Sequence, residues 1–491
     1  MFFLQCFADP DRQEQNVVSF EDFGLTFRRP GFAHNTNDFS ENDVSASVPI
    51  AVARYGPFRK KRNINPLLKT MKLQNPEQKF DLIVGIDRSD ATLAICAFQP
   101  LTGKSSEEEI SSSPEALHVW WGQLRDCFPK ARIAVAFEQP AANLIAFFAA
   151  TTNTVIYGLN PSATWAHRQS LVVSRARTDQ TDARDIAYFI ERHHPKLTPF
   201  HLAAGHLRRL QSLCEARRGF VDQRTALTNR LQALLKTYYP QALTMLHEDI
   251  WRGMNIEFLR RWPSPKKLKL VRSSTLETFF HKHGSRSQKR LKQRMDVVRE
   301  LIPLTDDPDI IEPAVMEMSL ILDQIEVLNR AIQEYDLKIA QLCDKHASQA
   351  DFFRALPGAG PVLAPRLFAA FAQHAPHCND AHRLAALCGI APITDKSGKT
   401  CRIYRRMRCD TFLCQTFFEW AGENWKHSTW AKAFVRYHQK KNKHFNTIIR
   451  ALALKWIRIL WKCWQDQTPY NEERYLQVLR SRGCEYLSAN A

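Results

Sequence analysis

The sequence predicts an α/β N-terminal domain, then a helical middle segment, then a mainly α-helical C-terminal unit. Short apolar runs of strand length alternate with helical patterns through 79–200. Leucine and isoleucine recur at gaps of three and four residues through 201–345. Residues 346–491 form a last unit, which opens with a glycine-rich turn of the helix-hairpin-helix type. Residues 1–78 have few periodic apolar patterns and are expected to form an irregular, partly disordered extension.

The composition is that of a globular protein. Of the 491 residues, 44% are hydrophobic and 24% are charged, which excludes wholesale disorder. No apolar run approaches the ~20 residues needed to cross a bilayer, and the first residues lack the basic region of a signal peptide. The 12 cysteines are scattered without a CxxC pair, so no zinc site is predicted. These features predict a cytoplasmic protein without a membrane partner.

The formal net charge of +18 is concentrated in three segments. Residues 265–294 hold ten Lys or Arg and one acid, residues 396–408 hold six and no acid, and residues 424–465 hold ten and no acid. Aromatic residues interleave with the last segment, a pattern typical of proteins that bind a phosphate backbone and stack on bases. The alternative is a solvated helix face above a tryptophan-rich core.

The elements between 79 and 200 follow from apolar runs. Nearly continuous apolar stretches predict buried strands at 82–87, 92–98, 133–137 and 153–159. The stretch 117–127 is predicted to be helical. Strands that alternate with helices predict an α/β domain.

The middle segment contains two apolar seams of helical spacing. The first consists of Leu210, Leu213, Phe220, Leu227, Leu231 and Leu234, and the second of Ile321, Ile325, Leu328, Ile332, Tyr335, Ile339 and Leu342. They fit an antiparallel helical hairpin or an intermolecular coiled coil. One wall of a helical bundle is an equally good explanation. The basic insert near 265–294 lies between the seams.

Four carboxylates occur at positions where chemistry is expected. Asp87 ends the first predicted strand and Glu138 follows another, while Asp179 and Asp182 are three apart at the start of a predicted helix and so share a face. A helix cap formed by Thr178 or Asp179 is the simpler explanation for one of the two. Crowded acids repel one another unless a cation neutralises them, and Mg²⁺ prefers carboxylate oxygen. Two such ions assist phosphodiester cleavage, so this order of acids predicts a ribonuclease-H-like nuclease domain that uses Mg²⁺.

Several motifs resemble the DEDD transposases of the bacterial insertion-sequence family IS110. They are Val84-Gly85-Ile86-Asp87, Ala134-Val135-Ala136-Phe137-Glu138 and Thr178-Asp179-Gln180-Thr181-Asp182-Ala183 in the first half, with Leu356-Pro357-Gly358, Ala386-Leu387-Cys388-Gly389-Ile390-Ala391-Pro392, Ser397-Gly398-Lys399 and Gln467-Thr468-Pro469-Tyr470 in the second. The resemblance covers about 80–200 and 346–475, in the family's order.

The resemblance implies a recombinase that excises and inserts its own mobile element. It implies a RuvC-like domain at 79–200, a coiled-coil segment at 201–345 and a C-terminal transposase domain at 346–491. It also implies a homo-oligomer, a dimer or a tetramer, that acts on double-stranded donor and target DNA with a noncoding bridge RNA as guide. The family's acids carry over to Asp87, Glu138, Asp179 and Asp182 as Mg²⁺ ligands.

The family's serine nucleophile carries over to Ser397. A hydroxyl that attacks a phosphate conserves the bond energy in a phosphoserine link, so strand exchange needs no ATP. Lys396, Lys399 and Arg402 are expected to hold the phosphate. Further contacts to nucleic acid are expected from Arg405, Arg406, Lys440, Lys441 and Lys443.

Other interpretations remain open. Ser-Gly is also an ordinary loop turn, which would leave Ser397 without a role. The chain is then either a RuvC-like junction endonuclease with water as nucleophile, or a nucleic-acid-binding protein with an inactive nuclease fold. The sequence also departs from the family pattern: the extension and 240–300 lengthen the chain, and the basic run after the serine does not end in glycine.

Overall fold

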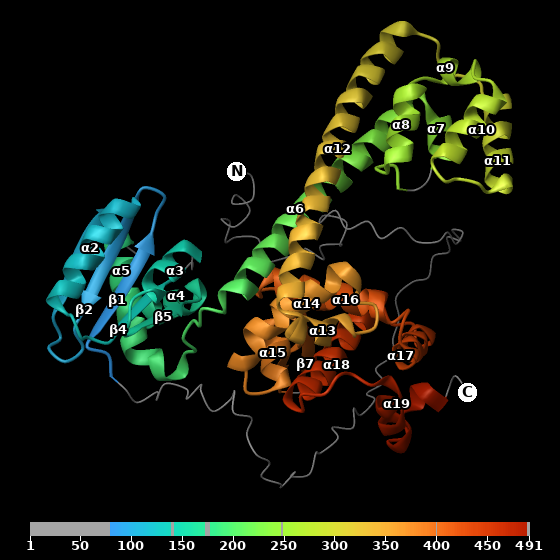
Figure 1. The fold of residues 1–491 in the computed structure, drawn as a ribbon. Coiled ribbons are helices and arrows are strands. Elements are labelled where there is room, and N and C mark those ends of the chain that lie inside the picture. The colour runs from blue at the N-terminus through green and yellow to red at the C-terminus, as the bar shows by residue number, and fades with distance from the viewer. Residues whose placement is uncertain (1–78, 139–141, 172–176, 247–248, 399, 489–491) are drawn as a thin grey trace. The chain divides into compact units, whose positions relative to one another are not determined.

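The computed structural model describes residues 79–138, 142–171, 177–246, 249–398 and 400–488 (Figure 1). The predicted N-terminal extension, 1–78, lies outside the described residues, as does Lys399. The described residues form an α/β part, a long helical hairpin that carries a helical insert, and a C-terminal helical part. This order agrees with the predicted fold class.

The α/β part is built on a five-stranded sheet in the order β3-β2-β1-β4-β5. The strands are β1 (Leu82–Arg88), β2 (Thr92–Phe98), β3 (Ser105–Ser111), β4 (Ile133–Phe137) and β5 (Thr154–Gly158). Strand β2 pairs antiparallel with both β1 and β3, whereas β4 runs parallel to β1 and β5 parallel to β4. This mixed sheet is consistent with a ribonuclease-H-like domain, and the four strands predicted from apolar runs are all present.

Helices cover both faces of this sheet. They are α2 (Pro114–Cys127), α3 (Ala142–Ala149), α4 (Pro161–Leu171) and α5 (Asp179–His193). Side chains alternate along β1, so Val84 packs with α2 and α3 while Ile83 packs with α5. A sheet buried on both faces explains why β1 and β4 have continuous apolar runs.

Strand β3 was not predicted. Its sequence SSEEEIS contains one large apolar residue, because this edge strand is largely exposed. Glu107 of β3 is held by Arg184 of α5, whose Nη2 donates to Oε2 at 2.8 Å. An edge strand that faces water lacks the apolar signal by which strands are recognised.

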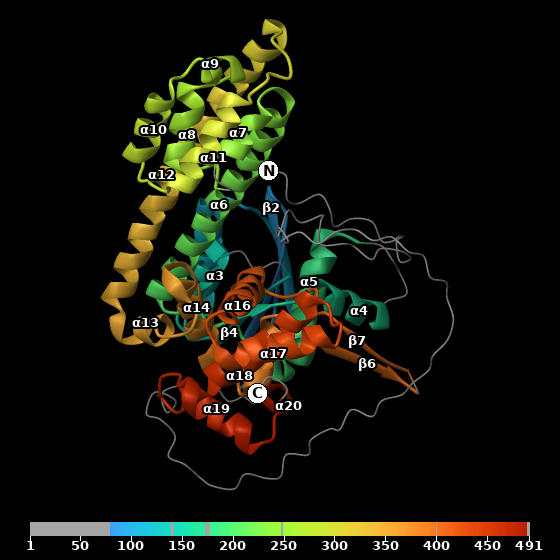
Figure 2. The ribbon, with the colours of Figure 1, turned by 90° about the vertical axis from the view of Figure 1, so that its right-hand side faces the viewer.

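The two predicted seams form the helices α6 (Gly205–Tyr238) and α12 (Pro308–Lys345), which lie side by side (Figures 1 and 2). Residues that come later in α6 contact residues that come earlier in α12: Arg217 contacts Asp336, Arg224 contacts Asn329, and Arg230 contacts Glu317. The hairpin is therefore antiparallel, which was one of the predicted alternatives. An intermolecular coiled coil stays a prediction.

Five short helices form the insert between α6 and α12. They are α7 (Pro240–Met245), α8 (Gly253–Arg261), α9 (Pro265–Lys269), α10 (Ser273–Lys282) and α11 (Gln288–Arg299). Their apolar residues make one cluster with the end of α6 and the start of α12. The insert is thus a small helical unit at the closed end of the hairpin (Figure 1).

The C-terminal part consists of helices and one two-stranded ribbon. Its elements are α13 (Ala347–Arg354), α14 (Gly360–His374), α15 (Ala381–Leu387), β6 (Ile393–Ser397), β7 (Thr400–Tyr404), α16 (Thr411–Asn424), α17 (Thr429–Lys440), α18 (Phe445–Gln465), α19 (Glu472–Ser481) and α20 (Glu485–Ser488). One core joins these helices to the open end of the hairpin. Among the described residues, no helix combines the length and apolar composition that crossing a bilayer requires.

Tryptophans form the centre of the C-terminal core. Trp420, Trp430 and Trp456 are fully buried, and each indole N–H donates a hydrogen bond inside the core. These rings are therefore not surfaces on which bases stack. The prediction of base stacking along 424–465 is wrong for Trp430 and Trp456, and the alternative of a tryptophan-rich core is correct for them, because large rings gain most from burial.

Candidate active site

Asp87 and Glu138 lie at the same edge of the sheet. Strands β1 and β4 are parallel neighbours, with Ile86 paired to Phe137. Asp87 and Glu138 are each the next residue along, so both carboxylates project where the two strands end. Both side chains are partly buried, in contrast to the exposed Glu108 and Glu109 of β3.

The first turn of α5 supplies two more carboxylates. Thr178 is the N-cap, and its hydroxyl accepts the backbone N–H of Thr181 at 3.2 Å while the Thr181 hydroxyl accepts the N–H of Thr178 at 3.0 Å. This reciprocal capping box satisfies the helix start without help from an acid. Asp179 and Asp182 are therefore not caps, so of the two predicted capping residues it is Thr178 that has this role.

Gly85 allows α5 to approach β1 closely. A Cβ built on Gly85 would lie 2.6 Å from the backbone nitrogen of Ala187 and still closer to the carbonyl oxygen of Ala183. Any side chain at this position would push α5 away from the sheet. The glycine two residues before Asp87 thus positions the acidic turn of α5.

The charges of the other three carboxylates act on Asp87. The pKa of Asp87 is raised, first by burial and then by the charges of Asp182 and Asp179, with a smaller effect of Glu138. A hydrogen bond from the backbone N–H of Arg88, at 3.1 Å, partly offsets the rise in pKa. Like charges brought together in this way favour a neutralising cation.

Arginines and a threonine that were not predicted contact these acids. Arg168 of α4 is buried, and its Nη1 lies 2.6 Å from Oδ1 of Asp182 and 3.2 Å from Oδ2 of Asp185. The Nε of Arg177 lies 2.8 Å from the second oxygen of Asp182. One turn before Arg168, buried Thr164 donates a hydrogen bond to Glu138. Thr164 and Arg168 are four residues apart on α4 and so share a face, which is the only feature of the sequence that could have indicated that both contact the acids.

The donor set suits a hard divalent cation, because it consists of carboxylate oxygens. In the described part of the chain, however, no three acidic, thiol or imidazole groups are close enough together to hold a metal ion as they stand. Asp182 has both oxygens occupied by arginines. The carboxylates therefore fit Mg²⁺ by chemistry, and a side-chain rearrangement around Asp182 is required before they could enclose it.

Ser397 lies in a different part of the chain, on the β6–β7 ribbon (Figure 2). It pairs with Thr400, so only Gly398 and Lys399 separate the strands. Gly398 has a φ of +54°, a backbone conformation that two-residue hairpin turns require and glycine tolerates. Both strands are exposed along their whole length, so the Ser397 hydroxyl is accessible to a large substrate.

The register of the ribbon places two of the cations that were predicted to act with Ser397 on opposite faces. Cross-strand partners share a face and successive residues alternate. Arg402, the partner of Asp395, therefore lies on the face of Ser397, whereas Lys396 lies on the opposite face. Lys399 is outside the described residues. Of the predicted phosphate-binding group, Arg402 is the member that the ribbon places beside the hydroxyl.

Of the remaining predicted nucleic-acid contacts, Arg405 and Arg406 follow the ribbon, Lys440 ends α17, and Lys441 and Lys443 lie in the loop after it. Arg405, Lys440, Lys441 and Lys443 are exposed, while Arg406 is half-buried. The Arg406 Nε has no hydrogen-bond partner among the described residues. These positions are compatible with phosphate contacts, which stay predictions.

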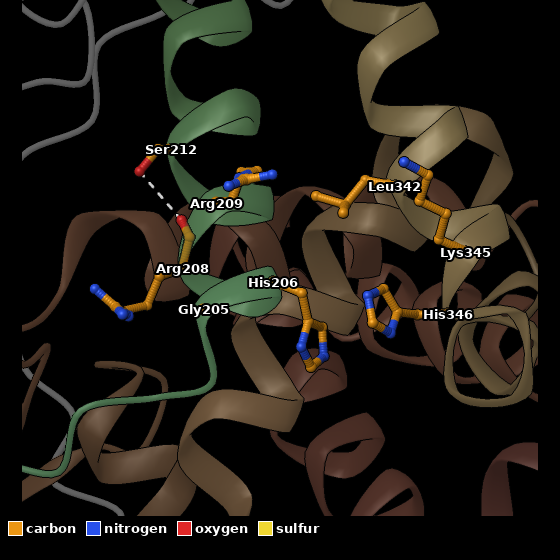
Figure 3. Close-up of a pocket in the computed structure, with 8 residues that line it drawn as sticks. All are labelled: Gly205, His206, Arg208, Arg209, Ser212, Leu342, Lys345 and His346. Carbon is orange, nitrogen blue, oxygen red and sulfur yellow. Dashed lines mark hydrogen bonds between the residues drawn. The ribbon is translucent and has the colours of Figure 1, made fainter.

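A second, basic site lies between the start of α6 and the end of α12 (Figure 3). The cavity has a volume of about 630 Å³, and its lining includes Arg208, Arg209 and Lys345. The rings of His206 and His346 stack in it with centroids 3.9 Å apart. Burial and the neighbouring His346 lower the pKa of His206, and a hydrogen bond with Gln349 offsets part of this. Sequence reasoning missed this pocket because its two sides are more than a hundred residues apart.

Two family models match this chain. A transposase model of the IS110 DEDD type matches residues 84–240. A second model, described as a transposase of the IS116/IS110/IS902 family, matches residues 350–436. The first range contains all four carboxylates, and the second contains the β6–β7 ribbon.

Two curated relatives from streptomycetes agree with these matches. A protein of Streptomyces coelicolor named as a mini-circle transposase for IS117 is 24% identical over 356 residues, which are 70% of this chain and 83% of that protein. A 44.8 kDa protein of the insertion element IS116 of Streptomyces clavuligerus is 24% identical over 267 residues, or 54% of this chain and 64% of that protein. The chain belongs to the IS110 family of DEDD transposases.

Proposed function

We propose that this transposase cleaves and rejoins DNA with Asp87, Glu138, Asp179 and Asp182 as the ligands of catalytic Mg²⁺. The observation that carries the proposal is the close packing of α5 on β1 at Gly85, beside the parallel strands on which Asp87 and Glu138 follow paired residues. Arg168 and Arg177 neutralise Asp182 in the present arrangement, and a divalent cation is proposed to take over that role when it binds the four carboxylates.

Bound Mg²⁺ would stabilise the charges that develop on the attacking and leaving oxygens of a phosphodiester. The protein's own part is to hold the carboxylates. Gly85 lets α5 pack against β1, and the hydrogen bond from Thr164 orients Glu138. Arg168 and Arg177 hold the Asp182 carboxylate when no metal ion is bound. Release of Asp182 from its arginines is the rearrangement that metal binding requires.

Ser397 is proposed as the nucleophile of strand transfer. Its Oγ attacks the phosphorus, a serine–phosphate ester forms, and one ester oxygen of the DNA strand leaves as a hydroxyl after it takes up a proton. The serine proton passes to a carboxylate or to water. A later attack by a DNA hydroxyl reverses these steps and restores the serine. Arg402, on the same face, is suited to hold the phosphate.

The acids and the serine belong to different parts of the chain, so the composite site is proposed to form in a homo-oligomer, a dimer or a tetramer. Double-stranded donor and target DNA are the proposed substrates. A noncoding bridge RNA is the proposed guide, since the chain's exposed basic segments suit phosphate backbones generally. Sequencing the RNA that co-purifies with the protein from its host tests this part directly, and absence of a recurrent structured RNA would contradict it.

The experiment that tests the catalytic proposal compares two substitutions on a labelled donor DNA. Asp87→Asn is expected to abolish Mg²⁺-dependent cleavage while DNA binding persists. Ser397→Ala is expected to abolish both strand exchange and the covalent protein–DNA adduct seen on denaturing gels. Thr400→Ala is the matched control, because it removes a hydroxyl from the paired position of the same exposed ribbon.

The outcomes separate the remaining interpretations. Cleavage that survives Ser397→Ala without an adduct would identify a RuvC-like endonuclease that uses water. Cleavage that survives Asp87→Asn would remove the proposed metal site. A protein that binds but never cleaves, with any divalent metal, would be an inactive nucleic-acid-binding relative.

A further inference from the structure

The insert of α7–α11 lies outside both regions that match the family models, which end at 240 and resume at 350. It is nevertheless a folded unit. Phe258, Phe280 and Leu268 are fully buried in a core that also includes Tyr238 of α6 and Leu322 of α12. This core fixes the surface of the insert relative to the end of the hairpin.

The basic residues of the insert are almost all on its surface. Nine of the ten Lys and Arg residues between 265 and 294 are exposed: Lys266, Lys267, Lys269, Arg272, Lys282, Arg286, Lys289, Arg290 and Lys292. The tenth, Arg294, is buried, where it donates to the Met245 carbonyl at 3.0 Å and to the Ser285 hydroxyl at 2.9 Å. Its guanidinium also lies 3.8 Å from the centroid of the Phe280 ring. Arg294 therefore stabilises the fold of the insert, whereas the side chains of the other nine cations are exposed to solvent.

Three acids of the insert contact basic side chains outside this group of nine. Asp249, Glu257 and Asp296 form ion pairs with Arg252, His283 and Arg299 respectively, none of which is among the nine exposed cations. Glu277 is the one acid between 265 and 294. Such a concentration of like charge destabilises a compact unit unless it meets an anionic partner.

The exposed cations of α9 and α11 belong to one surface. These two helices contact each other. On α11, Lys289 and Lys292 are three residues apart and share the solvent face, while Leu291 and Arg294 point into the core. Lys266 and Lys267 are exposed on α9, where Leu268 is buried.

Leu270, directly after α9, is an exposed apolar residue on this surface, but the aromatic residues of α8 and α10 are not available to a partner. The aromatic residues Trp262, Phe279 and Phe280 are buried. Binding to a lipid interface generally needs such residues on the surface, beside the cations. Nine exposed cations beside a single exposed leucine, with the aromatic rings buried, match a phosphate backbone better than a lipid interface.

We propose that α9 and α11, with the loops beside them, form a second nucleic-acid-binding surface that holds the phosphate backbone of a double helix without reading its sequence. This inference rests on the proposed function, since it takes nucleic acid as the substrate. On α6, 20 residues separate Arg218, which pairs with Glu419 of α16, from Tyr238 in the core of the insert. At 1.5 Å per residue this length of α6 is about 30 Å, which is close to one turn of a DNA duplex.

The test neutralises four exposed lysines of this surface in the full-length protein, as Lys266→Gln, Lys267→Gln, Lys289→Gln and Lys292→Gln. The matched control neutralises four exposed lysines elsewhere, as Lys104→Gln, Lys130→Gln, Lys196→Gln and Lys338→Gln. Both variants lose the same net charge. A third variant with Arg at the four insert positions keeps the charge and is expected to bind as the unmodified protein does.

Binding is measured between about 50 and 200 mM salt. The probes are a DNA duplex and an RNA duplex of random sequence, each about three helical turns long. The insert variant is expected to bind about tenfold or more weakly at the lower salt, with a salt slope reduced by up to about 3, because each lost phosphate contact removes about 0.7–0.9 from the slope. The control variant is expected to keep the slope.

The two probes distinguish the source of the phosphate. Weakened binding of RNA alone assigns the surface to the guide, weakened binding of DNA alone assigns it to donor or target, and weakened binding of both assigns it to duplex backbones in general. An unchanged slope with both probes, or an equal loss in the control, overturns the proposal. Failure of the proposed function is seen separately, as cleavage that persists in Asp87→Asn, since that substitution leaves the insert intact.

Discussion

The packing of α5 on β1 through Gly85 makes the most direct prediction about the active site. In Gly85→Ala, the new Cβ must move from 2.6 Å to at least 3.0 Å from the Ala187 nitrogen, and must move further to clear the Ala183 carbonyl oxygen. Both obstacles are backbone atoms that cannot rotate away. Helix α5 must therefore shift by roughly 0.5–1 Å, and Asp179 and Asp182 shift with it.

The size of the effect follows from this displacement. Overpacking of this kind costs about 1–3 kcal/mol of unfolding free energy. A misplacement of about 1 Å in a catalytic group lowers the rate by about 100-fold. We therefore expect Gly85→Ala to melt at a lower temperature and to cleave DNA about ten- to 100-fold more slowly, although it leaves every carboxylate in the chain.

The assay pairs thermal unfolding, followed by circular dichroism, with Mg²⁺-dependent cleavage of labelled donor DNA. Gly122→Ala is the control, because Gly122 lies on α2 and a Cβ there meets nothing within 4 Å. It is expected to be neutral or to stabilise by up to about 1 kcal/mol, as alanine does in a helix. If Gly85→Ala melts and cleaves as the unmodified protein does, Gly85 does not set the position of α5.

Three further predictions concern charge. Arg168→Gln removes the buried partner of Asp182 and is expected to lower the free energy of unfolding by about 1–3 kcal/mol in urea titrations, and an unchanged midpoint would contradict this. Because burial holds the pKa of His206 below its usual 6.5, the unfolded chain takes up this proton first as the pH falls, so stability is expected to decrease from about pH 7 to pH 5. His206→Gln should flatten that decrease, and an identical pH dependence of the melting temperature would show that His206 does not contribute. Neutralising Lys440 and Lys443 with Gln is expected to reduce the salt slope of DNA binding by about 0.7–0.9 for each phosphate contact, whereas an unaltered slope would exclude them from the interface.

The sequence was sufficient for features that depend on local pattern. Buried strands such as β1 and β4 were predicted because a sheet covered on both faces demands continuous apolar runs. The two long helices were predicted because their seams repeat at helical spacing. The ordered carboxylates could be recognised because they lie at the ends of apolar runs or in the first turn of a helical pattern, and both features are visible in the sequence.

The tertiary structure decided what depends on contacts between distant segments. Strand β3 has no apolar signal, since its pairing with β2 and the ion pair of Glu107 with Arg184 replace burial. The role of Arg168 beside Asp182 and the opposite faces of Lys396 and Ser397 follow from packing and strand register, which residue type does not specify. The tryptophans of 424–465 read equally well as a stacking surface or as a core, because an aromatic ring suits both. Only the folded chain shows that Trp430 and Trp456 are enclosed, while Lys432, Arg436, Lys440, Lys441 and Lys443 between them are exposed.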